Sequence, residues 1–138
     1  MKPNLIKGNR HQDERGIVRF NNNFDALDIK RVYIIENVDT DFTRAWQGHQ
    51  VEHRWFSPVK GSFKIKLIKI DTWNQPSPQL PVEEFMLNSE NLDVLHVPPG
   101  FVTSIQAAES GSRLMVFADH QLNEVRDEYR FPKDYFIL

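Results

Sequence analysis

Hydrophobic and polar residues alternate along SFKIKLIKI (Ser62–Ile70). Phe63, Ile65 and Leu67 fall on one face of this segment, and the lysines between them fall on the other. A period of two is typical of a β-strand with one buried face. We therefore expect the three apolar residues in the core and the lysines in solvent.

Other segments have the same character, because short runs rich in β-branched and aromatic residues are separated by turn residues. Thr72–Pro81 contains three prolines and is predicted to be a loop. His120–Arg130 lacks a strand pattern and is expected to form either a short helix or an ordered tail. The further predicted strands are Ile17–Phe20, Lys30–Val38, Val82–Leu87, Leu92–Val97, Phe101–Gln106 and Ser112–Ala118.

Many short strands joined by Gly- and Pro-containing turns favour an all-β sandwich or barrel. Periodicity alone leaves immunoglobulin-like, lipocalin-like and jelly-roll forms open. Gln47, His49 and His53 have the same parity in one predicted strand. Three polar groups on one face need solvent, partners or a ligand, and a jelly roll with a polar pocket between its sheets meets that need.

Composition restricts the function classes. The chain has 138 residues, a net charge of −2 and no cysteine, so we expect a single domain over 1–138, with no binding of nucleic acid. The lack of cysteine excludes disulfides and thiolate chemistry and fits a reducing compartment. No eighteen apolar residues run together, so neither a signal peptide nor a membrane association is expected. These features predict a cytoplasmic protein.

One stretch concentrates groups that can perform chemistry. RAWQGHQVEHRWFSPVKG (Arg44–Gly61) contains two histidines, two arginines, a glutamate and two tryptophans. It could be a metal site, an acid/base site for an organic substrate, or a polar strand on a barrel wall.

Six segments resemble, in order, the motifs of a known family. The ordered set is similar to the RmlC-type cupins and, more closely, to the WxcM-like group of dTDP-sugar 3,4-ketoisomerases, whose motifs include D-x-RG-x-L, KRVYYI and RG-x-HAHK. The resemblance implies a cupin-type jelly roll (a double-stranded β-helix) that forms a strand-exchanged homodimer. The six segments are DERGIV (Asp13–Val18), IKRVYII (Ile29–Ile35), RAWQGHQ (Arg44–Gln50), KGSFKI (Lys60–Ile65), VPPGF (Val97–Phe101) and ADHQLNEVRDEYRFPKDYF (Ala118–Phe136).

The chain departs from the family at the paired histidines. These fall at Gln47 and His49, so only the second is kept, and His53 is an additional histidine. Cupin metal sites also use a later glutamate and a third histidine, whose positions here hold Arg54 and Thr103. Zinc and iron need at least three N, O or S ligands. We therefore expect no metal and no other cofactor.

The implied reaction needs a base that removes a proton beside a ketone, and a group that returns a proton. Neutral histidine suits the first role, and a tyrosine or second histidine suits the other. Arginine binds pyrophosphate, and tryptophan can stack on a base or sugar. The expected catalytic residues are His49, Tyr33 and His53, and the expected substrate-binding residues are Arg44, Gln47, Arg54 and Trp46.

Alternative roles stay open for several of these residues. Tyr33 could be a core residue with a satisfied hydroxyl group, and Arg44 could form a surface ion pair. His53 could lie on the rim of a pocket. Trp46 could belong to the core or to a dimer interface.

The function expected from the resemblance is isomerisation of a nucleotide-linked, dTDP-type 4-keto-6-deoxy sugar through an enolate, as in polysaccharide biosynthesis. A 3- or 5-epimerase shares the enolate step, and a cupin that binds a sugar nucleotide without catalysis is the alternative from another class. The expected partners are the nucleotide sugar and a second copy of the chain. The segment before DERG is the candidate for crossing to that copy.

Overall fold

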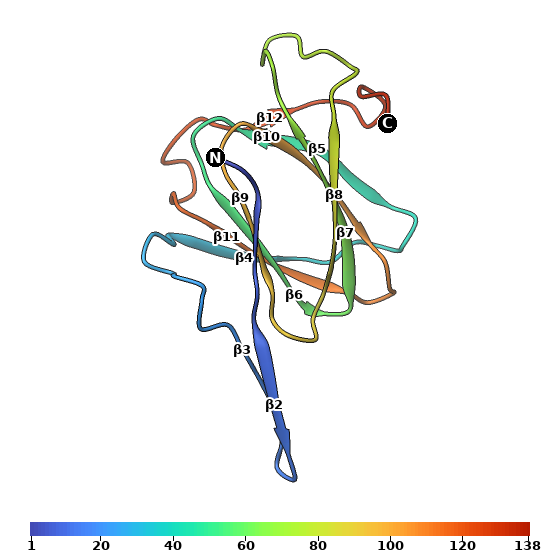
Figure 1. Ribbon diagram of the computed structural model, residues 1–138. Helices are drawn as coiled ribbons and strands as arrows, with labels where there is room; N and C mark the ends of the chain where they lie inside the picture. The colour runs from blue at the N-terminus through green and yellow to red at the C-terminus, as the bar shows by residue number, and fades with distance from the viewer.

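The computed structural model describes all 138 residues and contains strands and loops but no helix (Figure 1). Two five-stranded sheets face each other, and every paired strand in them is antiparallel. In spatial order the first sheet contains β1 (Asn4–Ile6), β9 (Val94–Val97), β6 (Arg54–Lys60), β11 (Arg113–Ala118) and β4 (Arg31–Ile35). The second contains β12 (Tyr129–Arg130), β5 (Thr43–His49), β10 (Phe101–Ala107), β7 (Ser62–Lys69) and β8 (Val82–Asn88).

The main core fills the space between the two sheets. The alternation in β7 has the predicted effect, because Phe63 and Ile65 are fully buried while the lysines between the core positions point away from it. Burial of one face of each sheet is what holds such a sandwich together. The core residues are Phe56, Phe63, Ile65, Leu67, Leu87, Leu95, Val97, Phe101, Ile105, Ala107, Leu114 and Val116.

A second, smaller core lies on the outer face of the second sheet. Trp46 and Phe136 belong to it, and their rings meet edge to face at 5.4 Å. The Pro-rich loop and the C-terminal tail cover this face, since the hydroxyl group of Tyr135 donates to the main-chain oxygen of Pro76. The predicted loop at Thr72–Pro81 is confirmed, and its packing fixes the tail against the sheet.

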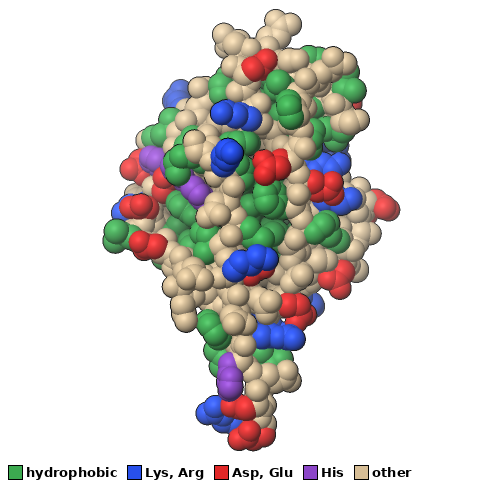
Figure 2. Space-filling model, viewed as in Figure 1, with side chains coloured by type: hydrophobic (Ala, Val, Ile, Leu, Met, Phe, Trp, Pro, Cys, Tyr) green, Lys and Arg blue, Asp and Glu red, His purple; other side chains and the backbone are tan.

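A two-stranded arm, formed by β2 (Asn9–Asp13) and β3 (Gly16–Phe20), projects away from the sandwich (Figure 1). Its strands pair only with each other. Figure 2 shows charged side chains at the tip of this arm and apolar ones nearer its base. Ile17 is 40% exposed and Val18 is 62% exposed, so the arm has apolar surface without a partner in the single chain.

The predicted strands lie where they were expected, with two corrections. The polar stretch is two strands rather than one, since β5 ends at His49 and β6 begins at Arg54. The strand predicted over Lys30–Val38 is shorter, because β4 ends at Ile35. Of the two forms expected for His120–Arg130, the ordered tail is confirmed, since this segment contains no helix and ends in β12. No helix long and apolar enough to cross a membrane is present.

Candidate active site

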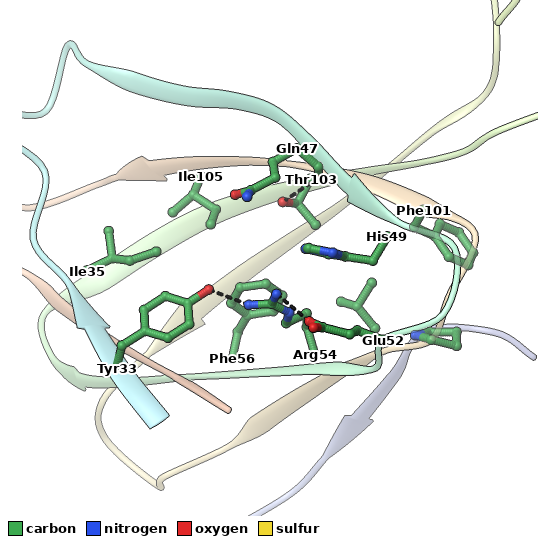
Figure 3. A pocket seen from close by; sticks show the side chains of 12 residues that line it. Tyr33, Ile35, Gln47, His49, Glu52, Arg54, Phe56, Phe101, Thr103 and Ile105 are labelled. Atoms are coloured by element: carbon green, nitrogen blue, oxygen red, sulfur yellow. Dashed lines mark hydrogen bonds and ion pairs between the residues drawn. The ribbon is translucent and has the colours of Figure 1, made fainter. Parts of the chain in front are cut away.

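A pocket lies between the two sheets, beside the turn at residues 50–53 that joins β5 to β6 (Figure 3). A partly apolar pocket with a few convergent polar groups is the usual form of a ligand site. Its polar side chains are Tyr33 from β4, Gln47 and His49 from β5, Glu52 from the turn, Arg54 from β6 and Thr103 from β10. Its apolar side chains are Ile35, Phe56, Val97, Pro98, Phe101 and Ile105.

His49 is the pocket residue best suited to act as a base. Its Nδ1 lies 2.8 Å from the main-chain oxygen of Asp127. A carbonyl oxygen can only accept a hydrogen bond, so Nδ1 carries the hydrogen and the free lone pair of the neutral ring is on Nε2. The ring projects into the pocket (Figure 3). The structure therefore offers a substrate an unprotonated ring nitrogen.

Asp127 holds this end of the pocket together. Its carboxylate accepts main-chain N–H bonds from Gln50 at 2.7 Å, Val51 at 2.9 Å and Glu52 at 2.7 Å. The side chain is 2% exposed. A buried carboxylate is stable when several donors satisfy it. The tail residue thus fixes both the turn after β5 and the tautomer of His49.

The pKa of the His49 imidazole lies below its ordinary value. Burial is the largest cause, and the positive charge of Arg54 is the second. The hydrogen bond to the Asp127 carbonyl and the charges of Glu52 and Asp127 raise the pKa, but by less. Burial and a nearby cation both disfavour the imidazolium, so His49 stays neutral to a lower pH than a histidine in water.

The opposite side of the pocket carries a buried charged network. Arg54 donates from Nη2 to a Glu52 carboxylate oxygen and from Nη1 to the hydroxyl oxygen of Tyr33, at 2.6 Å. Arg54 and Glu52 are each 7% exposed. Such a pair is stable inside a protein because each charge is compensated. The network sets the position of the Tyr33 hydroxyl group relative to His49 (Figure 3).

Four of the seven predicted site residues meet in this pocket. Tyr33, Gln47, His49 and Arg54 all line it. The positions matched to the cupin metal template, which include Thr103, also converge here. No group of three or more His, Cys, Asp or Glu side chains in the structure is arranged to hold a metal ion.

Arg44 and Trp46 do not line the pocket. Trp46 is 2% exposed, and its indole N–H donates to the main-chain oxygen of Lys133 in the outer core, so it has no free face for stacking on a substrate. Arg44 is exposed at the edge of the second sheet, and its guanidinium group lies 5.8 Å from the ring of Phe42. It shares a shallow surface depression with Gln47 and Arg130.

His53 also lies outside the pocket. The shared parity with His49 has no meaning, because the turn at residues 50–53 separates the two residues. The His53 Nδ1 atom lies 2.8 Å from Nε2 of His96, and the ring stacks near Trp55 on the outer side of the first sheet. The pocket therefore contains a single histidine.

Sequence reasoning missed two residues that build the site. Glu52 and Asp127 are both buried, but neither stands in an apolar pattern that would reveal it. Asp127 is 78 residues from His49, and the segment in which it lies was expected to form a short helix or an ordered tail without a role in the site. Glu128 from the same tail accepts a bond from the amide of Gln47 at 2.5 Å.

Comparison with known proteins gives consistent matches. The family model described as FdtA: WxcM-like, C-terminal matches residues 1–137. No protein with a curated description matches the sequence. Among solved structures, a mutant of the 3,4-ketoisomerase QdtA from Thermoanaerobacterium thermosaccharolyticum, in complex with TDP-4-keto-6-deoxyglucose, is 27% identical with a TM-score of 0.74, covering 97% of this chain and 91% of its own.

Two more distant structures share the fold. The WlaRB TDP-quinovose 3,4-ketoisomerase from Campylobacter jejuni is 20% identical, with a TM-score of 0.71 and coverage of 96% of this chain and 95% of its own. The rmlC epimerase from Mycobacterium tuberculosis is 15% identical, with a TM-score of 0.74 and coverage of 94% and 68%. The sandwich described above is thus the RmlC-like cupin jelly roll.

Proposed function

Because the chain belongs to the FdtA family (WxcM-like, C-terminal), we propose that it is a 3,4-ketoisomerase of a dTDP-linked 4-keto-6-deoxy sugar. The substrate class follows from QdtA, which is 27% identical and was crystallised with TDP-4-keto-6-deoxyglucose. One observation carries the assignment to this pocket: His49 has its Nδ1 hydrogen fixed on a carbonyl oxygen, and its unprotonated Nε2 faces a cavity that also contains the Tyr33 hydroxyl group.

In the proposed reaction, His49 Nε2 removes the proton from C3, beside the C4 ketone. The C–H electrons form the C3–C4 double bond, and the negative charge moves to O4. The enediolate then gains a proton on O4 and loses one from O3, so that O3 becomes the ketone oxygen, and C4 receives a proton from the His49 imidazolium. The net change moves one hydrogen from C3 to C4 and one from O3 to O4, and no oxidant or reductant is consumed.

Gln47 supports a mechanism with one histidine. A side-chain amide does not titrate in the working pH range, so Gln47 cannot act as a second acid or base. Its amide donates to Glu128, which leaves its oxygen available to accept a bond from a sugar hydroxyl group. We therefore assign Gln47 to substrate binding.

Incubation with dTDP-4-keto-6-deoxyglucose in deuterated water tests the function. A 3,4-ketoisomerase forms a 3-keto product, as read by NMR spectroscopy, and C4 of that product carries deuterium wherever the His49 imidazolium exchanges its proton with the solvent before returning it. Deuterium at C3 or C5 of an unchanged 4-keto sugar would instead make the protein an epimerase. Binding of the sugar nucleotide with neither a 3-keto product nor exchange would make it a binding protein.

We expect Arg44 to bind the diphosphate of the substrate at the rim of the pocket. Arg44 is exposed and forms no ion pair, and it lies beside pocket-lining Gln47. Charge-assisted bonds to a diphosphate give about 1.5–3 kcal/mol. Arg44→Ala should therefore weaken dTDP binding about 10- to 100-fold, since about 1.4 kcal/mol corresponds to tenfold, as measured by calorimetry.

The control for Arg44→Ala is Lys60→Ala, which removes one exposed positive charge at the C-terminal end of β6. The control should bind dTDP like the parent. Equal dTDP affinity of Arg44→Ala and the parent would show that Arg44 is a surface residue only.

We further propose a homodimer in which the β2–β3 arm crosses to the second copy. The arm exposes Val18, and the outer face of the first sheet exposes Val32 at 55% and Ile34 at 51%. Pairing would cover this apolar surface and the free strand edges. Light scattering at micromolar concentration should give twice the 16.2 kDa mass of the chain, and Val18→Asp should lower it. A monomeric parent would contradict the proposal.

A further inference from the structure

Arg54 has contacts that a simple substrate-binding arginine would not need. Nη1 bonds to the Tyr33 hydroxyl oxygen, and Nη2 bonds to the carboxylate of Glu52. Nε is buried and has no hydrogen-bond partner. The two terminal nitrogens of the guanidinium group are therefore engaged by the protein, and the residue is held in one orientation.

The bond from Arg54 decides which way the Tyr33 hydroxyl hydrogen points. Arg54 can only donate, so the phenolic oxygen is the acceptor and its own hydrogen is directed elsewhere. No protein atom accepts that hydrogen, because the bond from Arg54 is the single hydrogen bond of this hydroxyl group. The Tyr33 ring is also held by Arg31, whose guanidinium carbon lies 4.7 Å from the ring centre. The available acceptor for the hydrogen is thus a group in the pocket.

The charge of Arg54 has a second consequence for the pocket. A positive charge beside the phenolic oxygen stabilises the phenolate that forms when the proton is given away. The same charge disfavours protonation of His49, which Glu52 and Asp127 oppose. Glu52 compensates Arg54 in the resting protein, so the network is neutral before substrate binds.

We propose that Arg54 is a positioning residue for the reaction proposed above. It holds the Tyr33 hydroxyl group as the carrier of the oxygen-bound proton, and His49 carries the carbon-bound proton. Tyr33 gives its proton to O4 as the C3–H bond breaks. The resulting phenolate, paired with Arg54, takes the proton from O3 as the C3 ketone forms. Both residues return to their starting states, and every proton is accounted for.

The test is a double-mutant cycle with Tyr33→Phe, Arg54→Gln and the combination. If Arg54 acts through Tyr33, each single change should lower kcat by about a hundredfold, within the range for proton transfer by a positioned group. The kcat of the double variant should then be only slightly lower than that of Tyr33→Phe alone, because the two residues act as a unit. Losses that multiply would show that Arg54 acts on the substrate directly and would overturn the inference.

A second measurement separates this role from a structural one. Arg54→Gln should raise the pKa of His49, followed by NMR titration, whereas Arg54→Lys keeps the charge and should leave it close to the parent value. An unchanged His49 pKa in Arg54→Gln would contradict the inference. Arg113→Gln, which removes an arginine paired with Glu36 on the surface, is the control for loss of an arginine.

Arg54→Gln can fail to fold, and the parent can lack isomerase activity; each case has its own readout. If Arg54→Gln fails to fold because Glu52 is left unpaired, the double variant E52Q/R54Q, which removes both charges, replaces it in the cycle with Tyr33→Phe. A parent without isomerase activity would reject the proposed function. The His49 titration needs no substrate, so it would still test whether the charge of Arg54 lowers the pKa of His49.

Discussion

Replacement of His49 by asparagine is expected to lower kcat by at least about a hundredfold. General-base catalysis contributes typically 10²–10⁴-fold, and His49 is the single histidine in the pocket. Asparagine keeps a polar side chain of similar size, so KM should change little and the loss should fall on kcat. Steady-state kinetics with dTDP-4-keto-6-deoxyglucose provide the measurement.

His53→Asn is the matched comparison for this variant. His53 contacts His96 outside the pocket, so its replacement should change kcat by less than about threefold, far below the effect of losing a base. If His49→Asn turned over substrate at a similar rate to the parent, His49 would not be the base. A large loss of kcat in His53→Asn would show that the second copy of the chain brings the outer side of the first sheet, where His53 lies, into the active site.

The pH dependence of the reaction follows from the pKa of His49. Because burial and Arg54 lower this pKa, the neutral base persists to a lower pH than the reference value of about 6.5 for histidine. The acidic limb of kcat/KM, which reports the free enzyme, should therefore lie below that value. His49→Asn should lose this limb, and a limb above the reference value would contradict the electrostatics of the pocket.

Replacement of Asp127 by alanine is expected to lower both the stability and the activity of the protein. Three main-chain N–H groups in the turn at residues 50–53 lose their acceptor. Breaking such a buried charged arrangement costs about 3 kcal/mol, which lowers Tm by about 10 °C for a chain of this size. Calorimetric unfolding measures this loss.

The activity of Asp127→Ala should fall about tenfold or more at temperatures where the variant is folded, because a small displacement of the base is costly. Asp134→Ala is the control, since Asp134 is an exposed aspartate in the C-terminal residues that follow β12. It should match the parent in Tm and kcat. Parent-like Tm and kcat in Asp127→Ala would show that the tail does not hold the base.

The all-β character of the fold was readable from local patterns. In β7 the alternation of apolar residues with lysines identified the buried face, because side chains of a strand point to opposite sides in turn. The prolines of Thr72–Pro81 marked a loop, since proline cannot donate to a strand ladder. The parity argument failed at His53, because it holds only while a strand continues, and β5 ends at His49.

Part of the pocket lining was predicted from the sequence. His49, Tyr33, Gln47 and Arg54 were found through residue type and the order of motifs, and they meet in one pocket. Trp46, expected at the substrate, lies in the outer core, which was the alternative left open, because composition cannot tell whether an aromatic side chain in a strand faces a pocket or an outer core. That choice depends on what covers the sheet.

The sequence alone determined the fold class, the buried face of β7 and the residue types available for proton transfer, because each depends on neighbours a few positions away. The tertiary structure decided the rest. It joined Asp127 to His49 across 78 residues and Arg54 to Tyr33 across 21 residues. Hydrogen bonds between residues so far apart depend on how whole strands and the tail pack together, and no local pattern records them.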